Sequence, residues 1–155
     1  MRLTLSIITL LTILSAPAWC QAKHTGIGII LGEPTGFSWK MWLDGSMAYD
    51  AGIAWSFAGE PRIHVHGDVL WHNFNVLQNT FDIDESNGWL PLYYGIGGIL
   101  KVGNDARLGA RFVLGTTYVF KNAPFDIFLE VAPVMDVIPE TELRLNAAVG
   151  SRFWF

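Results

Sequence analysis

The closing stretch of the chain, residues 142–155, reads ELRLNAAVGSRFWF and decides the fold. Within it, mainly apolar residues alternate with polar or small ones. One set is Leu143, Leu145, Ala147, Val149, Phe153 and Phe155, and the other is Arg144, Asn146, Ala148, Gly150 and Arg152. Because successive side chains of a β-strand point to opposite faces, this alternation predicts a strand with one apolar face and one small or charged face.

The same alternation recurs upstream between turn signals such as Gly59-Glu60-Pro61 and Gly103-Asn104-Asp105. It predicts eight strands, at about 24–31, 35–43, 46–58, 62–73, 90–101, 105–119, 124–134 and 142–155. Lengths near 9–11 residues are what a tilted strand needs to cross a bilayer. These segments show no helical periodicity. We therefore predict an all-β fold, an eight-stranded antiparallel up-and-down barrel.

Length and composition narrow the class of protein. The 155 residues leave room for one domain, and only 15% of them are charged, against about 25% in typical soluble domains. After the N-terminal segment, no stretch reaches the roughly 18 apolar residues of a membrane helix. The net charge of −4 provides no basic patch and argues against a nucleic-acid partner.

Residues 1–22 are predicted to be a cleaved signal peptide, followed by a barrel domain at 23–155. The segment starts with a basic residue, continues with an apolar run and ends in small residues, as export signals do. Cleavage after Ala18, Cys20 or Ala22 fits this pattern, and we favour Ala22. Lipid attachment to Cys20 is disfavoured, because the bulky residue before it is a tryptophan.

The direction of the apolar face separates a soluble barrel from a membrane barrel, since in the latter it meets lipid and the polar face fills the lumen. The polar face here is rich in glycine, which weakens a strand but suits a narrow lumen. It also carries nearly equal numbers of opposite charges, which can pair when buried. This expected lumen network consists of Lys40, Asp50, Asp68, Arg107, Arg111, Asp126, Glu130, Arg144 and Arg152. We therefore predict a transmembrane barrel whose lumen is filled by its own side chains.

Aromatic residues gather near the ends of the predicted strands. The set comprises Trp39, Trp42, Trp55, Trp71, Tyr94 and Tyr118. Tryptophan and tyrosine are enriched where a membrane meets water, so these residues are expected to form interfacial girdles.

Three segments carry a resemblance to a known family: GIILGEPTG at 28–36, LPLYYGIGG at 90–98 and FDIFLEVAP at 125–133. With the overall pattern, the chain resembles the transmembrane domain of OmpA and, more closely, an uncharacterised family of small bacterial outer-membrane barrels. The resemblance implies location in a Gram-negative-type outer membrane, surrounded by its lipid. It implies no catalytic motif and no cofactor. It also implies that Phe155 is recognised by the barrel-assembly machinery during biogenesis, and it indicates no other protein partner.

The densest group of potential metal ligands is His64, His66, Asp68 and His72, which share one face of one predicted strand. Two imidazoles two residues apart, with a carboxylate, are able to bind a metal ion. Metal sites normally fix their ligands through surrounding partners, which one strand does not supply. We therefore expect these residues to join hydrogen bonds in the lumen, and we predict no metal.

We predict a non-catalytic barrel with a structural or envelope-anchoring role. One alternative is a lipid-modifying outer-membrane enzyme. It would need a serine, a histidine and a carboxylate within hydrogen-bond reach. Ser56, His64 and Asp50 are the set whose spacing permits contact, although nothing in the sequence demands it.

A soluble periplasmic barrel of the lipocalin kind is a second alternative. It would have the same strand count with the faces reversed, so that Trp39, Trp55 and Phe112 line an inner cavity. The glycines and charges of the opposite face rank it lower.

The connection at 74–89 is the longest and the hardest to place. Either the flanking strands extend past the membrane as a hairpin, or the strand count is off by one. The side of the membrane that holds it is left open.

Overall fold

The computed structural model describes residues 24–33, 35–56, 62–81, 84, 86–103 and 106–155. The expected signal peptide at 1–22, its cleavage site and the expected end of the third strand at 57–58 lie outside the described residues. The elements are β1 (Thr25–Glu33), β2 (Thr35–Trp42), β3 (Met47–Ser56), β4 (Arg62–Asn73), α2 (Asn75–Phe81), β5 (Gly88–Trp89), β6 (Leu92–Val102), β7 (Arg107–Phe120), β8 (Phe125–Ile138) and β9 (Glu142–Trp154).

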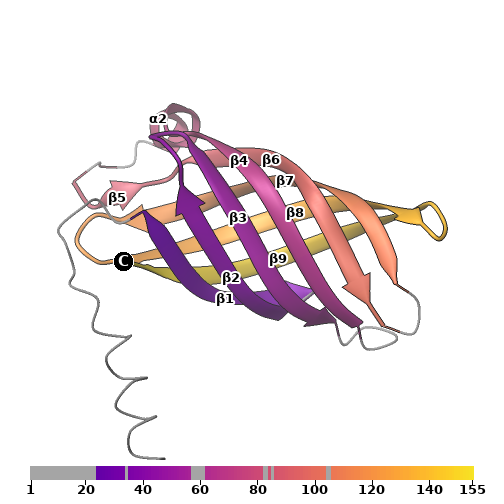
Figure 1. Ribbon diagram of the computed structural model, residues 1–155. Coiled ribbons are helices and arrows are strands. Elements are labelled where there is room, and N and C mark those ends of the chain that lie inside the picture. Colours follow the sequence, from indigo (N-terminus) through magenta and orange to yellow (C-terminus); the bar gives the residue numbers. More distant parts are fainter. Residues whose placement is uncertain (1–23, 34, 57–61, 82–83, 85, 104–105) are drawn as a thin grey trace, which may run out of the picture.

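Of the nine strands in the described part of the chain, eight close into an antiparallel barrel (Figure 1). Each barrel strand pairs with the next along the chain, and β1 pairs with β9 to complete the ring. The β4 strand pairs directly with β6, because β5 lies outside the barrel. The predicted eight-stranded up-and-down barrel is confirmed. The largest difference in bounds is in β8, which runs on to Ile138 instead of ending at 134.

The two faces of each strand are buried in the sense predicted for a membrane barrel. On β8, the outward side chains of Ile127 and Leu129 are 48% and 58% exposed, whereas the inward Asp126 and Glu130 are 0% and 6% exposed. The same period of two runs along the other long strands. The apolar face therefore forms the outer wall, and the charged face fills the interior.

The lipocalin-like alternative is wrong about the direction of these faces. It required Trp39, Trp55 and Phe112 to line an inner cavity. They are 37%, 38% and 48% exposed, on the outer face of β2, β3 and β7. Successive side chains of a strand alternate between its two faces, so these three residues could face inward only if every strand were turned over.

The connection between β4 and β6 contains a helix that the sequence did not predict. The side-chain oxygen of Asn73 accepts hydrogen bonds from the N–H groups of Asn75 at 3.0 Å and Val76 at 3.3 Å, which caps the start of α2. With seven residues, α2 is too short for its periodicity to stand out. Within the described residues, no helix is long and apolar enough to cross a membrane.

The short strand β5 continues the line of β6. Gly88 and Trp89 pair with β7 in the same register as Leu92 does. The line breaks at Pro91, which has no N–H to donate to the neighbouring strand. From α2, the Gln78 amide accepts from the N–H of Leu90 at 2.9 Å and donates to the carbonyl of Gly88 at 3.4 Å. The described part of the 74–89 connection is therefore neither a hairpin that extends the flanking strands nor an additional strand of the barrel.

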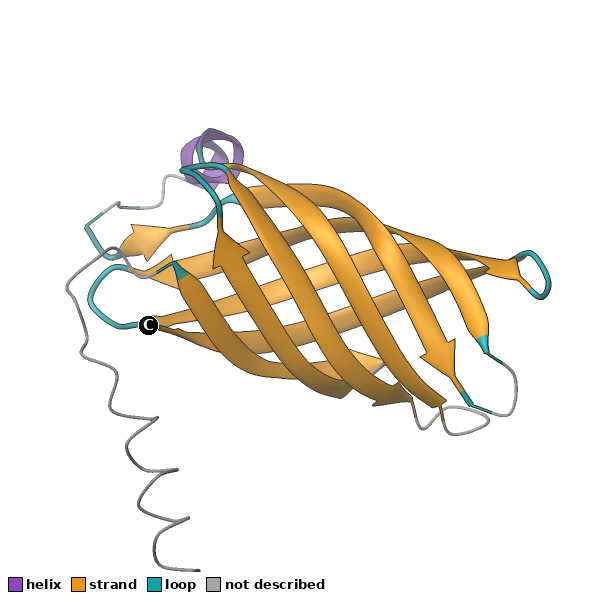
Figure 2. Cartoon of the chain, in the orientation of Figure 1, coloured by secondary structure: helices purple, strands orange, loops and turns teal. Residues whose placement is uncertain are grey.

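The two ends of the barrel differ (Figures 1 and 2). The start of β1, the end of β9, α2, β5 and the turns after β2 and β7 lie at one end, called here the terminal end. The strands β3, β6 and β8 end at the opposite end. The strands β7, β8 and β9 have 14, 14 and 13 residues against 9 and 8 in β1 and β2, so the β8–β9 hairpin projects beyond the rest of the wall.

Candidate functional site

The interior of the barrel is the candidate site, because charged and polar side chains meet there from seven strands. The buried set is Lys40, Asp50, His64, His66, Asp68, His72, Lys101, Arg111, Asp126, Glu130, Asp136 and Arg152. Each lies on the inward parity of its strand. Buried charges require partners, so the ion pairs and hydrogen bonds among these residues determine the structure and chemistry of the lumen.

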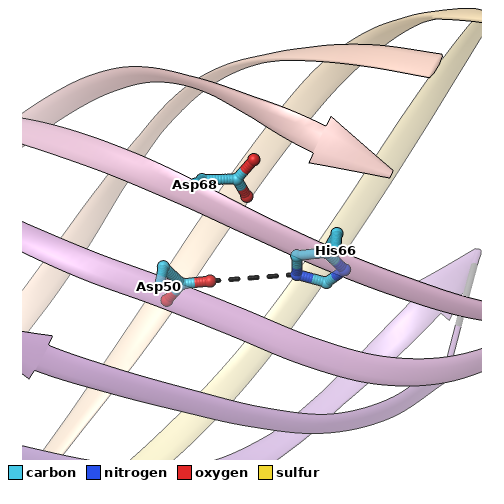
Figure 3. Close-up of side chains that lie close together, drawn as sticks. All are labelled: Asp50, His66 and Asp68. Carbon is cyan, nitrogen blue, oxygen red and sulfur yellow. Dashed lines mark ion pairs between the residues drawn. The ribbon is translucent and has the colours of Figure 1, made fainter. Parts of the chain in front are cut away.

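The four suspected metal ligands all face the lumen, but they do not form one site. His64 and His72 lie eight residues apart on β4, about 27 Å at the usual rise of a strand. His66 and Asp68 instead meet Asp50 of the neighbouring strand β3 (Figure 3). One potential ligand atom from each of these three side chains lies within 4.8 Å of the other two. Of the four, only His66 and Asp68 belong to this cluster with Asp50.

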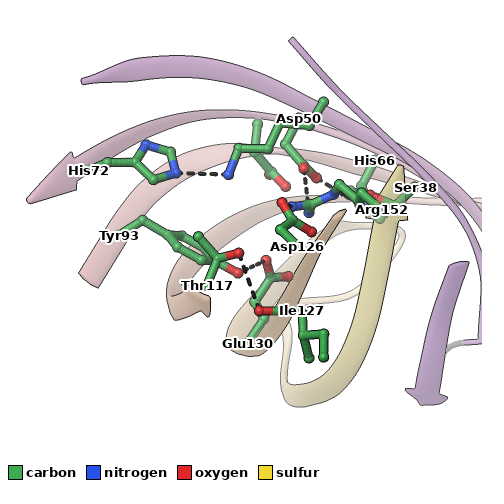
Figure 4. A network of polar contacts seen from close by, with 12 residues as sticks. Ser38, Asp50, His66, His72, Tyr93, Thr117, Asp126, Ile127, Glu130 and Arg152 are labelled. Carbon is green, nitrogen blue, oxygen red and sulfur yellow. Dashed lines mark hydrogen bonds and ion pairs between the residues drawn. The ribbon is translucent and has the colours of Figure 1, made fainter. Parts of the chain in front are cut away.

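Arg152 on β9 joins four strands in the middle of the lumen (Figure 4). Its Nη2 donates to Asp50 Oδ1 at 2.8 Å, and its Nε donates to Ser38 Oγ at 2.8 Å. Its Nη1 lies 3.6 Å from Asp126 Oδ2, and the guanidinium carbon lies 3.9 Å from the centre of the Phe128 ring. A single arginine thereby ties β2, β3 and β8 to β9 through the interior.

Arg111 on β7 forms a second group next to the first. Its guanidinium donates to the carboxylates of Asp68 on β4 and Glu130 on β8. The hydroxyl of Tyr93 on β6 also donates to Glu130, at 3.0 Å. This group links β4, β6, β7 and β8, so the two arginines together brace most of the barrel wall.

Lys40 occupies the terminal end of the lumen. Its Nζ lies 2.8 Å from His72 Nε2, and His72 Nδ1 lies 3.1 Å from the carbonyl oxygen of Ser46. A carbonyl only accepts, so Nδ1 carries the proton and Nε2 accepts from the ammonium. The rings of Trp42 and Tyr93 flank the Nζ atom with their centres at 5.0 and 4.9 Å. Aromatic rings and one ammonium therefore close this end.

A separate ion cluster closes the opposite end. Lys101 Nζ and Asp136 Oδ1 are 2.8 Å apart and both side chains are buried. Arg107 and Arg144 each reach Glu142 Oε2 at 2.7 Å. The Arg144 side chain is 42% exposed, so this residue, expected in the lumen, lies at its mouth.

Lys101, Asp136 and Tyr93 belong to the buried network but were not singled out in the sequence. Lys101 was the last residue of its expected strand, and Asp136 lay beyond the expected end of β8. Asp136 keeps the same parity as Asp126 and Glu130, so extending the alternation past residue 134 would have found it.

Four of the six expected girdle residues lie on the outer wall with 37–56% of their surface exposed: Trp39, Trp55, Trp71 and Tyr94. Trp71 and Tyr94 stack with ring centres 6.0 Å apart, near the terminal end. Trp55 meets Phe37 edge-on at 6.2 Å, on the strands that run to the opposite end. These pairs occupy the two rims of the wall.

The two remaining girdle candidates and Phe155 lie at the terminal end. Tyr118 packs edge-on against Phe120 at 4.8 Å. Trp42 differs from the expectation, because its ring contacts His72 at 4.4 Å and lies at the mouth of the lumen. It shares the inward parity of Lys40, two residues earlier. The Phe155 side chain is 62% exposed, and its N–H donates to the carbonyl of Thr25 at 2.9 Å.

Among the described residues, Ser56, Ser38 and Ser151 do not assemble a nucleophilic site with a histidine and a carboxylate. Ser56 and Asp50 are six residues apart on β3, about 20 Å at the usual strand rise, so one imidazole cannot reach both. Ser38 accepts from Arg152, and the Ser151 hydroxyl donates to the carbonyl of Asp126 at 2.8 Å. These hydroxyls stabilise the wall and the lumen.

Asp44 is one of two described carboxylates outside the strands whose pKa is lowered, the other being Asp84. Asp44, in the turn after β2, accepts hydrogen bonds on Oδ1 from the N–H groups of Ser46 at 2.7 Å and Met47 at 2.6 Å. These backbone donors lower the pKa of Asp44 below its ordinary value, because they stabilise the charged form.

A closed eight-stranded barrel with an apolar outer wall and a charged, filled lumen defines the class of small barrels of the outer-membrane type. The structure is similar to the crystal structure of the N-terminal β-barrel domain of Pseudomonas aeruginosa OprF, with a TM-score of 0.66. The match covers 86% of this chain and 98% of that one, at 13% sequence identity. No protein-family model matches the chain, and no curated protein matches it by sequence. The expected OmpA-type fold is thus confirmed.

Proposed function

We propose that this protein is a non-catalytic, integral outer-membrane barrel with a structural, envelope-anchoring role. In this proposal the signal peptide directs export, the barrel-assembly machinery inserts the chain, and lipid surrounds the finished wall. The proposal rests on one observation: the charged face of each strand is buried, and the apolar face is exposed.

Every barrel strand exposes large apolar side chains to the outside. Examples, one from each strand, are Ile29, Phe37, Ile53, Ile63, Ile96, Leu114, Leu129 and Val149, each between 45% and 59% exposed. Soluble monomers rarely expose a continuous apolar patch of more than a few hundred Å². An apolar belt around a whole barrel is stable where hydrocarbon replaces water, which supports a membrane location.

The filled lumen supports a structural role over transport. A cavity among Asp50, His66, Arg111, Glu130 and Arg152 leaves about 20 Å³ for the centres of water molecules. Such a space holds about one water molecule. Ion pairs from opposite walls cross the lumen on either side of it, so the interior braces the barrel.

The separation of Ser56 from Asp50 and the structural bonds of Ser38 and Ser151 support a role without catalysis. The exposed Phe155 side chain beside the first strand is accessible to an assembly factor before the barrel enters the membrane. Phe155 does not contribute to the lumen network, which supports a separate role in assembly.

Fractionation of cells that express the full chain tests the proposal. We expect the protein in the outer-membrane fraction, soluble only in detergent, and migrating differently on a gel before and after boiling. Release with the periplasmic contents on osmotic shock would refute the membrane location. Turnover of phospholipid or lipid A by the purified, folded barrel would refute the non-catalytic role.

A further inference from the structure

Asp50, His66 and Asp68 converge on one point of the lumen from two neighbouring strands (Figure 3). Asp50 and Asp68 stand directly opposite each other in the β3–β4 register, and His66 lies two residues before Asp68 on the same face. One ligand atom from each lies within 4.8 Å of the other two, and all three side chains are buried. We propose that these three residues bind a single divalent transition-metal ion, with Zn²⁺ as the best match.

Each carboxylate bonds to an arginine through one of its two oxygens. Asp50 Oδ1 accepts from Arg152, while Asp50 Oδ2 lies 3.8 Å from His66 Nε2. Asp68 Oδ2 accepts from Arg111, while Asp68 Oδ1 is buried with no hydrogen-bond partner. Buried polar atoms are nearly always partnered, so this oxygen has the capacity to accept a further ligand such as a cation or a water molecule.

The spacing of these atoms suits coordination better than hydrogen bonding. Two ligands bound to one zinc ion at about 2.0–2.2 Å in a tetrahedron lie about 3.4 Å apart. The separation of 3.8 Å between His66 Nε2 and Asp50 Oδ2 is too long for a hydrogen bond but close to this value. Small side-chain rotations would bring the three atoms onto one ion.

Glycines make room for two of the ligands. Gly52 pairs with His66 across β3–β4, and Gly97 pairs with Asp68 across β4–β6. A Cβ atom at Gly52 would collide with the His66 ring, and one at Gly97 would collide with Asp68 Oδ1. The absence of side chains at these two positions therefore leaves room for the imidazole over β3 and for the Asp68 carboxylate beside β6.

The charge of the surrounding lumen favours a cation. Among the described residues, four carboxylates share two guanidinium groups here: Asp50, Asp68, Asp126 and Glu130 with Arg111 and Arg152. Counting Lys40, which is hydrogen-bonded to His72, still leaves one excess negative charge. Two like charges directly opposite each other on paired strands, as in Asp50 and Asp68, are destabilising unless a cation lies between them.

Imidazole nitrogen and carboxylate oxygen are both zinc ligands, and three protein ligands leave the fourth position of the tetrahedron for water. The small cavity lined by Asp50 and His66 provides the place for that water. Arg111 and Arg152 hold the outer oxygens of the two carboxylates and so orient the inner ones toward the ion.

Calorimetric titration of the folded, untagged barrel in detergent with Zn²⁺ tests the site. We expect saturable binding of one ion per barrel, weakened at least about tenfold in His66→Ala. His64→Ala is the matched control, because His64 is equally buried on the same face of the same strand but lies outside the site; it should keep the affinity of the unmodified chain. No saturable binding, or equal loss in both variants, would overturn the proposal.

Cobalt provides a second measurement that does not depend on a variant folding. Co²⁺ bound by one imidazole and two carboxylates in the unmodified barrel should give visible d–d absorption that Zn²⁺ displaces. Should His66→Ala fail to show the folded gel mobility, His66→Gln replaces it. Absence of any zinc-displaceable cobalt band in correctly folded protein would overturn the proposal.

Discussion

Arg152 on β9 and Asp50 on β3 form an ion pair across the lumen, with 2.8 Å between Nη2 and Oδ1. The two side chains are 1% and 3% exposed, and β1 and β2 lie between their strands in the wall. The contact therefore passes through the interior and not along the sheet. Removing one partner of such a pair leaves a buried charge without compensation.

Replacing Arg152 with Met should lower the free energy of unfolding by about 3–5 kcal/mol, because Asp50 and Asp126 would lose their cation in the interior. Urea unfolding of the refolded barrel, followed by tryptophan fluorescence, measures the change. Arg144→Met is the matched control at the exposed mouth, where water screens the pair and little effect is expected. Equal effects of the two variants would contradict the buried lumen.

Replacing Glu130 with Ala should cost a similar amount, about 3–5 kcal/mol, since Arg111 would keep only Asp68 and the Tyr93 hydroxyl would lose its acceptor. Glu130→Gln keeps an acceptor for Tyr93 and should cost less. The same unfolding measurement separates them. A loss below about 1 kcal/mol in the alanine variant would mean that Glu130 faces the outside.

Replacing Ile96 with Arg tests the lipid contact of the outer wall. Ile96 is outward at the middle of β6, where a bilayer would disfavour the charge by about 2–4 kcal/mol. Leu143, near the tip of the projecting β8–β9 hairpin and 75% exposed, is the control, and Leu143→Arg should cost little. The free energy of folding into lipid vesicles measures the cost of each substitution. Equal tolerance of both substitutions in vesicles would refute the membrane belt.

The free energy of unfolding should decrease at low pH, because Asp44 in the turn after β2 loses its charge. Its pKa in the folded protein is lower than the ordinary 3.8, because backbone N–H groups stabilise its charged form. The stabilisation is therefore complete above the unfolded pKa and is lost as the pH falls through the lower folded value. Asp44→Asn lacks this charge, so its difference from the unmodified chain should shrink between pH 6 and about pH 2. A constant difference across that range would contradict the role of the charge.

Replacing Phe155 with Ala should lower the amount of assembled barrel in cells while leaving spontaneous folding into vesicles nearly unchanged. The alanine variant keeps the backbone N–H that bonds to Thr25, so the wall is preserved. The yield of heat-modifiable protein in membranes measures assembly. An unchanged yield in cells, or an equal loss in both settings, would refute recognition of this side chain by an assembly factor.

The strands and their faces could be predicted because they depend on neighbours in the chain. Side chains two residues apart share a face, so the alternation in 142–155 indicated both a strand and its inward residues. The helix α2 escaped prediction because seven residues carry too little periodicity. Asp136 escaped because the predicted strand ended at 134, although β8 continues to Ile138.

The pairing of the lumen residues belongs to the tertiary structure. The alternation placed Asp50, His66 and Arg152 on inward faces, but nothing local indicated that they would meet. Their distances depend on the register between strands and on closure of the ring, which brings β9 within reach of β3. Side-chain direction is a property of a few adjacent residues, whereas contact across a barrel depends on how all eight strands are staggered around it.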